Sequence, residues 1–303
     1  MLKKRARFWL AMSLTLSLLA FSYACGGKKD DTGTGADNTG GGGDTSSKAQ
    51  EWTPKGDEGS ITGKISFTGT APAPQKIDTA QDANCAAKNP NLMTETVVAK
   101  GDKLQNVIVY IKDGTLADGK KLSDYSFKTP DTEVTLDQNG CHYVPHVIVM
   151  QANQKLKVIN SDQTNHNIHA LPKSGGGNDE WNQSQGPGAA PIMETFKRPE
   201  IVPIKCNQHP WMKAYAGVFK HPFFAVSKDD GSYEIKGVPP GKYTVVAWQE
   251  KGPTESKPME VTVTKGAATA DFTFDASAMA AITGSNSSLE VVPAIELPML
   301  GNH

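Results

Sequence analysis

Hydrophobic positions in this chain fall in short stretches separated by turn residues, beginning near residue 60. The stretches alternate apolar with polar side chains or are rich in β-branched and aromatic residues, which is typical of β-strands. Gly- and Pro-containing turns separate them, and helical periodicity is limited to 88–94 and part of 277–282. Many short strands of this kind predict an all-β chain built from sandwiches. The segments predicted as strands are 61–67, 107–111, 134–136, 147–150, 156–159, 233–235, 243–248, 259–263 and 271–274.

The first 24 residues have the pattern of an export signal. Four Lys and Arg residues precede a mostly apolar run over 8–21, which is shorter than the roughly 20 residues that span a bilayer. Ala24 then precedes Cys25, and this arrangement resembles a bacterial lipoprotein signal, in which the cysteine carries the lipid. We therefore expect a signal peptide over 1–24 and a protein anchored in the envelope through lipidated Cys25, in the periplasm or at the cell surface. Plain secretion is the alternative.

The segment after Cys25 predicts a linker, and the charge balance argues against one class of function. Residues 26–50 contain eight glycines and no large apolar side chain, so 25–57 is predicted to be a lipidated cysteine followed by a disordered linker. Lys and Arg number 31 against 32 Asp and Glu, and removal of 1–24 would leave a net charge of −5. The absence of a basic excess argues against a nucleic-acid-binding protein.

The run DDGSYEIKGVPPGKYTVVAW over 229–248 resembles the signature of carboxypeptidase-regulatory-like, transthyretin-type β-sandwich modules. The resemblance implies a structural module whose opening strand is similar to 59–67, more than 100 residues upstream. We therefore expect one discontinuous sandwich from 58–115 and 227–275, with another domain inserted between its halves. The tail 276–303 has no core-forming pattern and stays unassigned.

The inserted stretch contains Cys206, His209 and Met212 at C-x2-H-x2-M spacing. Thiolate, imidazole and thioether form a soft ligand set that suits copper, and a mononuclear blue-copper site needs a second histidine from elsewhere. Candidates lie upstream in the run NSDQTNHNIH, which contains His166 and His169.

These two segments together resemble the cupredoxins, most closely the amicyanin and pseudoazurin branch. The resemblance implies a Greek-key sandwich over 125–226 holding one type 1 copper, with His166, Cys206, His209 and Met212 as ligands. It further implies that Asn167 hydrogen-bonds toward the cysteine loop, and that Pro210 and Trp211 frame a partly exposed His209 edge through which electrons leave. His169 is the rival for the first ligand position, but residues three apart on a strand face opposite ways.

Cys85 and Cys141 remain, and in an oxidising compartment two spare cysteines usually pair. The alternative is a second metal site built from Cys141, His142 and His146. His221 lies where the two modules should join, and packing is favoured there over metal ligation. We found no paired carboxylates, no Ser-His-Asp arrangement and no cluster of three further histidines, so the chain is not expected to be an enzyme.

The sequence thus favours an envelope-anchored copper protein that carries single electrons between redox partners. Its acidic mature surface suits a basic partner such as a c-type cytochrome, and a monomer is expected. A copper-binding or storage lipoprotein without electron transfer and a structural surface module are the alternatives. Two sequential domains, with 58–226 as an elaborated cupredoxin, are the rival to domain insertion.

Overall fold

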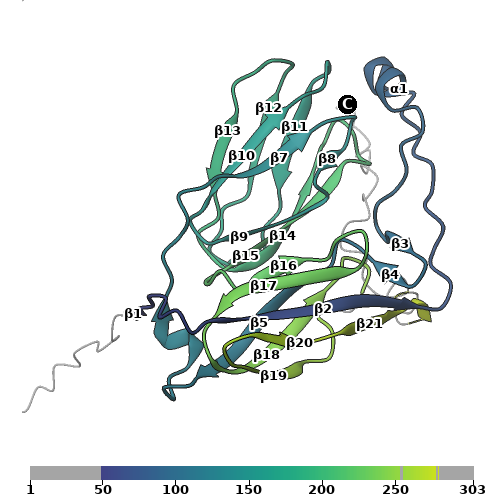
Figure 1. The fold of residues 1–303 in the computed structure, drawn as a ribbon. Helices are drawn as coiled ribbons and strands as arrows, with labels where there is room; N and C mark the ends of the chain where they lie inside the picture. The colour runs from purple at the N-terminus through teal and green to yellow at the C-terminus, as the bar shows by residue number, and fades with distance from the viewer. Residues whose placement is uncertain (1–48, 253–254, 278, 280–303) are drawn as a thin grey trace, which may run out of the picture. The chain divides into compact units, whose positions relative to one another are not determined.

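A computed structural model describes residues 49–252, 255–277 and 279, and these fold almost entirely into β-strands (Figure 1). The predicted all-β class is confirmed. Short helical elements with defined bounds are α1 (Ala83–Lys88) and the 3-10 turn η1 (Leu122–Asp124). Within the described residues, no helix has both the length and the apolar character needed to cross a membrane. The signal predicted over 1–24, the lipidation predicted at Cys25, most of the linker and nearly all of the tail lie outside the described residues.

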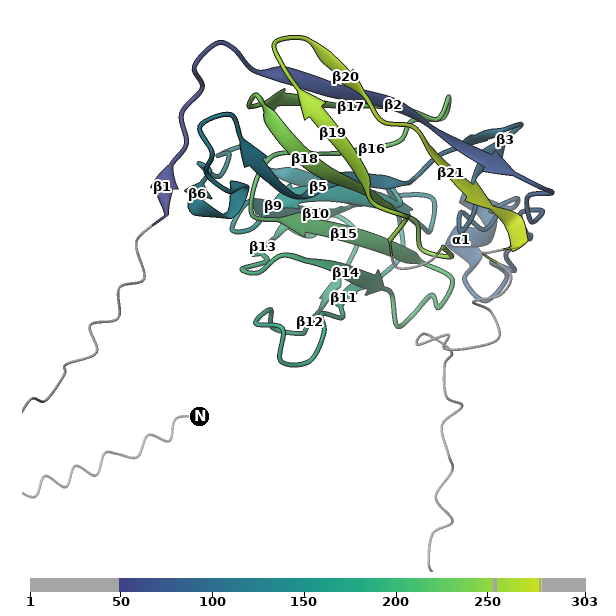
Figure 2. The same cartoon turned by 90° about the horizontal axis from the view of Figure 1, so that it is seen from below.

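Strands from the two ends of the described chain form one sandwich, which we call sandwich A (Figure 2). Strand β2 runs antiparallel to β17 and parallel to β20 and β21, so segments about 170 residues apart share a sheet. One sheet contains β2 (Gly59–Thr68), β3 (Ala99–Lys100), β4 (Lys103–Leu104), β17 (Ser232–Val238), β20 (Ala267–Thr269) and β21 (Phe272–Asp275). The other contains β5 (Ile108–Leu116), β16 (Phe224–Val226), β18 (Gly241–Trp248) and β19 (Met259–Val263).

The strands between these halves form a second sandwich, sandwich B, which has its own hydrophobic core. One of its sheets contains β7 (Val134–Gln138), β8 (Tyr143–Val144), β10 (Lys155–Asn160) and β13 (Ile192–Thr195). The other contains β9 (Val147–Gln151), β11 (His166–Ala170), β12 (Trp181–Gln185), β14 (Glu200–Lys205) and β15 (Lys213–Phe219). Strand β14 pairs with both β11 and β15, which brings the predicted ligand segments to one end of this sheet.

Strand β5 explains how the two sandwiches pack together. Its successive residues Ile108 and Val109 are both fully buried, although they point to opposite faces. Val109 packs in the core of sandwich A, while Ile108 packs with Val147 of β9 and Phe219 of β15 in a separate cluster. An apolar run without alternation is expected for a strand covered on both sides. The sheet of sandwich A that contains β5 and the sheet of sandwich B that contains β9 and β15 therefore share a hydrophobic interface.

The structure corrects two details of the sequence interpretation. Order begins before 58, because β1 (Gln50–Glu51) pairs with β6 (Tyr125–Ser126) and Trp52 packs against the aromatic rings of Phe127 and Phe223. The one or two helical turns expected within 88–94 are wrong, since α1 ends at Lys88. Asn89 precedes a proline, and proline disfavours helical backbone in the residue before it.

Candidate metal centre

The C-x2-H-x2-M segment forms a tight loop between two antiparallel strands. Strand β14 ends directly before Cys206 and β15 begins directly after Met212, with Lys205 paired to Lys213. Inside the loop, Cys206 N donates to Met212 O at 3.1 Å and Met212 N donates to His209 O at 2.9 Å. All three donor-bearing side chains are buried, and Cys206 and Met212 belong to the core of sandwich B.

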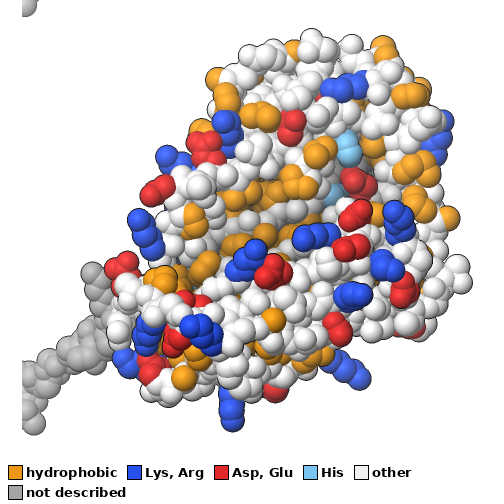
Figure 3. Space-filling view, in the orientation of Figure 1, with side chains coloured by type: hydrophobic (Ala, Val, Ile, Leu, Met, Phe, Trp, Pro, Cys, Tyr) orange, Lys and Arg blue, Asp and Glu red, His pale blue; other side chains and the backbone are white. Residues whose placement is uncertain are grey.

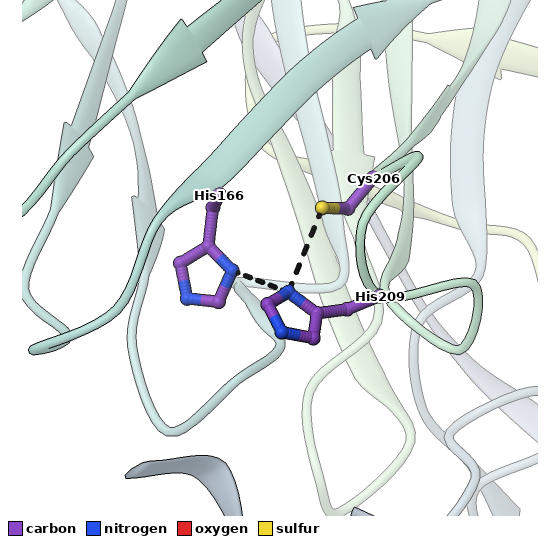
Figure 4. A group of neighbouring side chains, drawn as sticks. All are labelled: His166, Cys206 and His209. Carbon is purple, nitrogen blue, oxygen red and sulfur yellow. Dashed lines mark hydrogen bonds between the residues drawn. The ribbon is translucent and has the colours of Figure 1, made fainter. Parts of the chain in front are cut away.

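His166 reaches this loop from the first position of β11. Its Nδ1 lies 2.9 Å from His209 Nδ1, and His209 Nδ1 lies 3.8 Å from Cys206 Sγ (Figure 4). One ligand atom from each of His166, Cys206 and His209 falls within 4.8 Å of the others. The fold thus brings together two imidazoles and a thiol from segments about 40 residues apart.

The outer nitrogens of both imidazoles face carboxylates. His166 Nε2 is 2.9 Å from Asp162 Oδ2, and His209 Nε2 is 3.3 Å from Asp82 Oδ2. An ionised carboxylate only accepts hydrogen bonds, so each Nε2 carries a proton and each Nδ1 is left with a lone pair. Two lone pairs 2.9 Å apart need a cation between them, which a shared proton or a metal ion supplies. This donor set fits a metal ion held by the two Nδ1 atoms and Cys206.

The surroundings of Cys206 favour its thiolate. Burial raises the pKa of this thiol, but hydrogen bonds from His166 and from backbone N–H groups, including that of Asn167, outweigh burial and hold the pKa below its usual value. The Asn167 Oδ1 atom also accepts the backbone N–H groups of Asn207 and Gln208, at 2.7 and 3.3 Å. Because the thiolate is the form that binds metals, the site is prepared for a cation.

The two histidines differ in their protonation. Burial lowers the pKa of His166, but its contacts with Asp162 and Cys206 outweigh burial and raise that pKa to about 8. Burial and the neighbouring His166 lower the pKa of His209. The shared proton therefore resides on His166 Nδ1, which lies 2.9 Å from His209 Nδ1 and is hydrogen-bonded to Cys206.

His169 does not face this centre. Its Nδ1 lies 3.1 Å from Asn207 Oδ1, and its Nε2 lies 2.7 Å from Glu180 Oε1. These contacts lie on the face of β11 opposite to His166, as the three-residue spacing requires.

The expected exposure of the His209 edge is wrong. His209 is only 4% exposed, because its Nε2 lies against Asp82 and within 3.7 Å of Cys85 Sγ in helix α1. Of its flanking residues, Pro210 is exposed, whereas Trp211 is half-buried and donates from Nε1 to Cys141 O at 3.0 Å. The Trp211 ring lies 5.0 Å from the His209 ring. The His209 ring therefore faces α1 instead of solvent, while Asn207, Gln208 and Pro210 of the same loop are exposed.

The remaining cysteines pair as predicted, since Cys85 and Cys141 form a disulfide. This pairing contradicts the alternative metal site, because a disulfide sulfur is not a thiolate ligand. His142 and His146 instead contact Glu95, and His146 Nε2 lies 2.8 Å from Glu250 Oε1. These four side chains line a cavity together with Trp211, and Figure 3 shows histidine at the surface next to acidic side chains.

Two site residues were missed by the sequence analysis. Asp162 precedes His166 by four residues in the run NSDQTNH, so its proximity was a signal that could have been used. Asp82 lies 127 residues before its partner His209, in a segment without any metal-binding pattern, and nothing local pointed to it.

Comparisons with known proteins give partial and weak matches. The family model described as "Polysaccharide lyase family 4, domain II" matches residues 220–271, which lie in the second half of sandwich A. No curated protein sequence matches the chain. Amicyanin from Paracoccus versutus is 17% identical, with 36% of this chain and 96% of amicyanin covered at a TM-score of 0.26.

A purple cupredoxin from Nitrosopumilus maritimus is 15% identical, covering 28% of this chain and 98% of the cupredoxin at a TM-score of 0.24. A copper-containing nitrite reductase from Thermus scotoductus is 20% identical over 29% of this chain at a TM-score of 0.26, and the chain spans only 22% of that enzyme. Every TM-score is well below 0.5, so these matches do not assign the chain to a family.

Proposed function

We propose that the chain is a type 1 copper protein of the cell envelope that carries single electrons and is not an enzyme. The observation that carries this proposal is the convergence of His166 Nδ1, His209 Nδ1 and Cys206 Sγ in the buried end of sandwich B. Two imidazoles with one thiolate are a donor set that selects copper, and a thioether is the usual weak additional ligand. Met212, which is fully buried in the same core, supplies that thioether.

Copper held by these residues would supply a one-electron change between Cu(I) and Cu(II). The protein contributes a donor set that stays in place when that charge changes. Cys206 is the residue directly after β14, its backbone is bonded to Met212, and Asn167 holds the following two N–H groups. A rigid loop of this kind keeps the reorganisation of the ligands small.

An optical spectrum of the Cu(II)-loaded chain tests the proposal. A thiolate ligand in a type 1 site gives an intense visible absorption band, so we expect a coloured protein with one copper per chain. A colourless protein after loading, or one whose colour is unchanged by removal of Cys206, would rule out a type 1 site.

The burial of His209 favours a second candidate, a copper-binding or storage lipoprotein without electron transfer. A ligand residue that is 4% exposed offers little surface for direct contact with a redox partner. Reduction of the Cu(II) form by a reduced c-type cytochrome separates the two functions. Rapid, saturable reduction supports the electron carrier, whereas reduction only by small-molecule reductants supports storage.

The cellular setting is also part of the proposal. We propose export through residues 1–24, lipidation at Cys25 and residence in the envelope as a monomer, with 26–48 as a spacer. A net charge of −5 after removal of the signal is the feature that suits a basic cytochrome-like partner.

For the domain organisation, we propose that 125–226 is a cupredoxin inserted into a carboxypeptidase-regulatory-like sandwich built from 58–115 and 227–275. The pairing of β2 with β17 supports this division, because it places the two halves in one sheet. The rival with two sequential domains requires β2 to pair with strands of sandwich B. Among the described residues, β2 pairs with β4, β17, β20 and β21 instead.

A further inference from the structure

Helix α1 is joined to both sides of the candidate metal centre although it belongs to a segment outside sandwich B. Asp82 begins the helix, and its Oδ1 accepts the backbone N–H groups of Asn84 and Cys85 at 2.8 and 3.1 Å. Its other oxygen, Oδ2, accepts from Thr164 Oγ1 at 2.6 Å and lies 3.3 Å from His209 Nε2. One carboxylate thus caps the helix and holds the outer nitrogen of a proposed ligand.

The other end of α1 reaches the second imidazole through Asp162. Lys88 Nζ lies 2.8 Å from Asp162 Oδ1, and Asp162 Oδ2 lies 2.9 Å from His166 Nε2. The same carboxylate accepts the backbone N–H groups of Gly140 and Cys141 at 2.7 and 2.8 Å. Asp162 therefore joins His166, the last residue of α1 and the backbone at the disulfide.

Hydrophobic burial does little to hold α1 in this position. The helix has six residues, and Cys85 is its only buried one. A helix this short is not stable by itself in water. Its buried attachment to sandwich B is therefore the Cys85–Cys141 disulfide, which lies beside His209, with Cys85 Sγ 3.7 Å from His209 Nε2.

We propose that α1 is a clamp that closes the metal centre from outside, with Asp82 and Asp162 as positioning residues and the Cys85–Cys141 disulfide as its latch. The two carboxylates hold both imidazoles with Nδ1 turned toward Cys206, so neither ring can rotate without losing a hydrogen bond. The latched helix covers His209 and excludes water from that edge. The positioning role rests on the proposed copper site, whereas the covering role concerns the protein alone.

The covering role is tested on the metal-free full chain, by the rate at which iodoacetamide modifies Cys206, measured at that residue by mass spectrometry. With Cys85 and Cys141 both replaced by Ser, we expect the rate to rise by about ten-fold or more, because α1 opens without its latch. Circular dichroism checks that the strands persist. Reduction of the wild-type disulfide with a phosphine is the second arm, should the double variant fail to fold. Equal rates in wild-type and unlatched protein would overturn the clamp.

The positioning role is tested with Asp82→Asn. The amide oxygen still caps α1, as Asn is a good N-cap residue, so the amide nitrogen faces His209 and donates to Nε2. That donation moves the ring proton to Nδ1, where it occupies the lone pair that would bind a metal ion. We expect copper affinity, measured by competition with a chelator, to fall by about 10- to 100-fold.

Asp78→Asn is the matched control, since Asp78 lies in the same segment and its Oδ1 caps a turn at Ala80 N. An Asp82→Asn affinity equal to that of this control, with only thermal stability reduced, would show that Asp82 is purely structural and would overturn its positioning role. A wild type that binds no copper would refute the proposed function, and with it the positioning role. The alkylation experiment would then still decide whether α1 closes the site.

Discussion

Asn167 Oδ1 accepts the backbone N–H of Asn207 at 2.7 Å, so a side chain of β11 holds the loop that begins at Cys206. The backbone N–H of Asn167 also donates to Cys206 Sγ at 3.5 Å. One residue therefore joins the strand carrying His166 to the loop carrying the other three proposed ligands. With the donor atoms held in this way, each ligand can be tested by itself.

The visible absorption band tests the thiolate role of Cys206, and the reduction potential tests the thioether role of Met212. Cys206→Ala should abolish the intense visible band of the Cu(II) form, because no other free cysteine lies within the described residues. Met212→Leu should leave a coloured protein with a raised reduction potential, since the axial ligand tunes the potential and a sulfur donor helps to stabilise Cu(II). Absorption spectra and redox titration measure both effects. A visible band that survives in Cys206→Ala would contradict the proposed ligand set.

The choice between His166 and His169 gives a second prediction. His166→Ala should remove the visible band, because its Nδ1 lies 2.9 Å from His209 Nδ1. His169→Ala should retain it, because both nitrogens of His169 contact Asn207 and Glu180 away from Cys206. Spectra of the two copper-loaded variants, with metal content measured in parallel, decide this. The reverse result would assign the ligand to His169.

The burial of His221 at the junction of the two sandwiches predicts that the folded chain loses stability in mild acid. Burial lowers its pKa to about 4. Its Nε2–H donates to Ile111 O and its Nδ1 accepts the N–H of Phe223, so the neutral ring is the bonded form. This packing within an aromatic cluster is the role favoured for His221 from the sequence.

The direction of this pH effect follows because the pKa of His221 in the folded chain lies below its value of 6.5 in the unfolded chain. As pH falls from 6.5 toward 4, the unfolded chain binds a proton that the folded chain does not, so stability is lost across that window. The shift corresponds to about 3 kcal/mol. Denaturant unfolding at pH 7 and pH 4.5 should show a smaller acid loss for His221→Gln than for wild type. Parallel losses in the two proteins would refute this assignment.

Substitution of Gly63 tests whether the two sandwiches unfold as separate units. A Cβ there would lie 1.9 Å from Ala270 O and 2.8 Å from the Tyr233 ring, so Gly63→Ala forces β2 away from its neighbours. We expect a loss of about 2 kcal/mol or more in sandwich A, with the copper spectrum unchanged. Lys64→Ala, at an exposed position of β2, is the control. A copper band lost together with sandwich A at the same denaturant concentration would show that the sandwiches unfold as one unit.

The anchor predicted at Cys25 is checked by mass spectrometry of the mature N-terminus. A lipid-modified Cys25, with residues 1–24 removed, is expected from the basic start, the short apolar run and the cysteine that follows. Cys25→Ser should release the protein from the membrane fraction. An unmodified terminus at another residue would indicate plain secretion.

The sequence alone determined the features that depend on near neighbours in the chain. Strands such as β2 and β18 were predictable because buried and exposed positions alternate or apolar residues cluster within a few residues. The loop from Cys206 to Met212 was predictable because a seven-residue segment contains all of its donors. By contrast, β12 and β13 were missed, since Gln185 is the only buried residue in the two strands together.

Only the tertiary structure decided what covers the metal centre. The burial of His209 depends on Asp82 and Cys85, which lie more than 120 residues away in the chain. A six-residue helix with one buried side chain leaves no periodic signal, so its position over the site comes from long-range contacts and a disulfide. The exposure of a loop is a property of whatever packs against it, and a local sequence pattern does not contain that information.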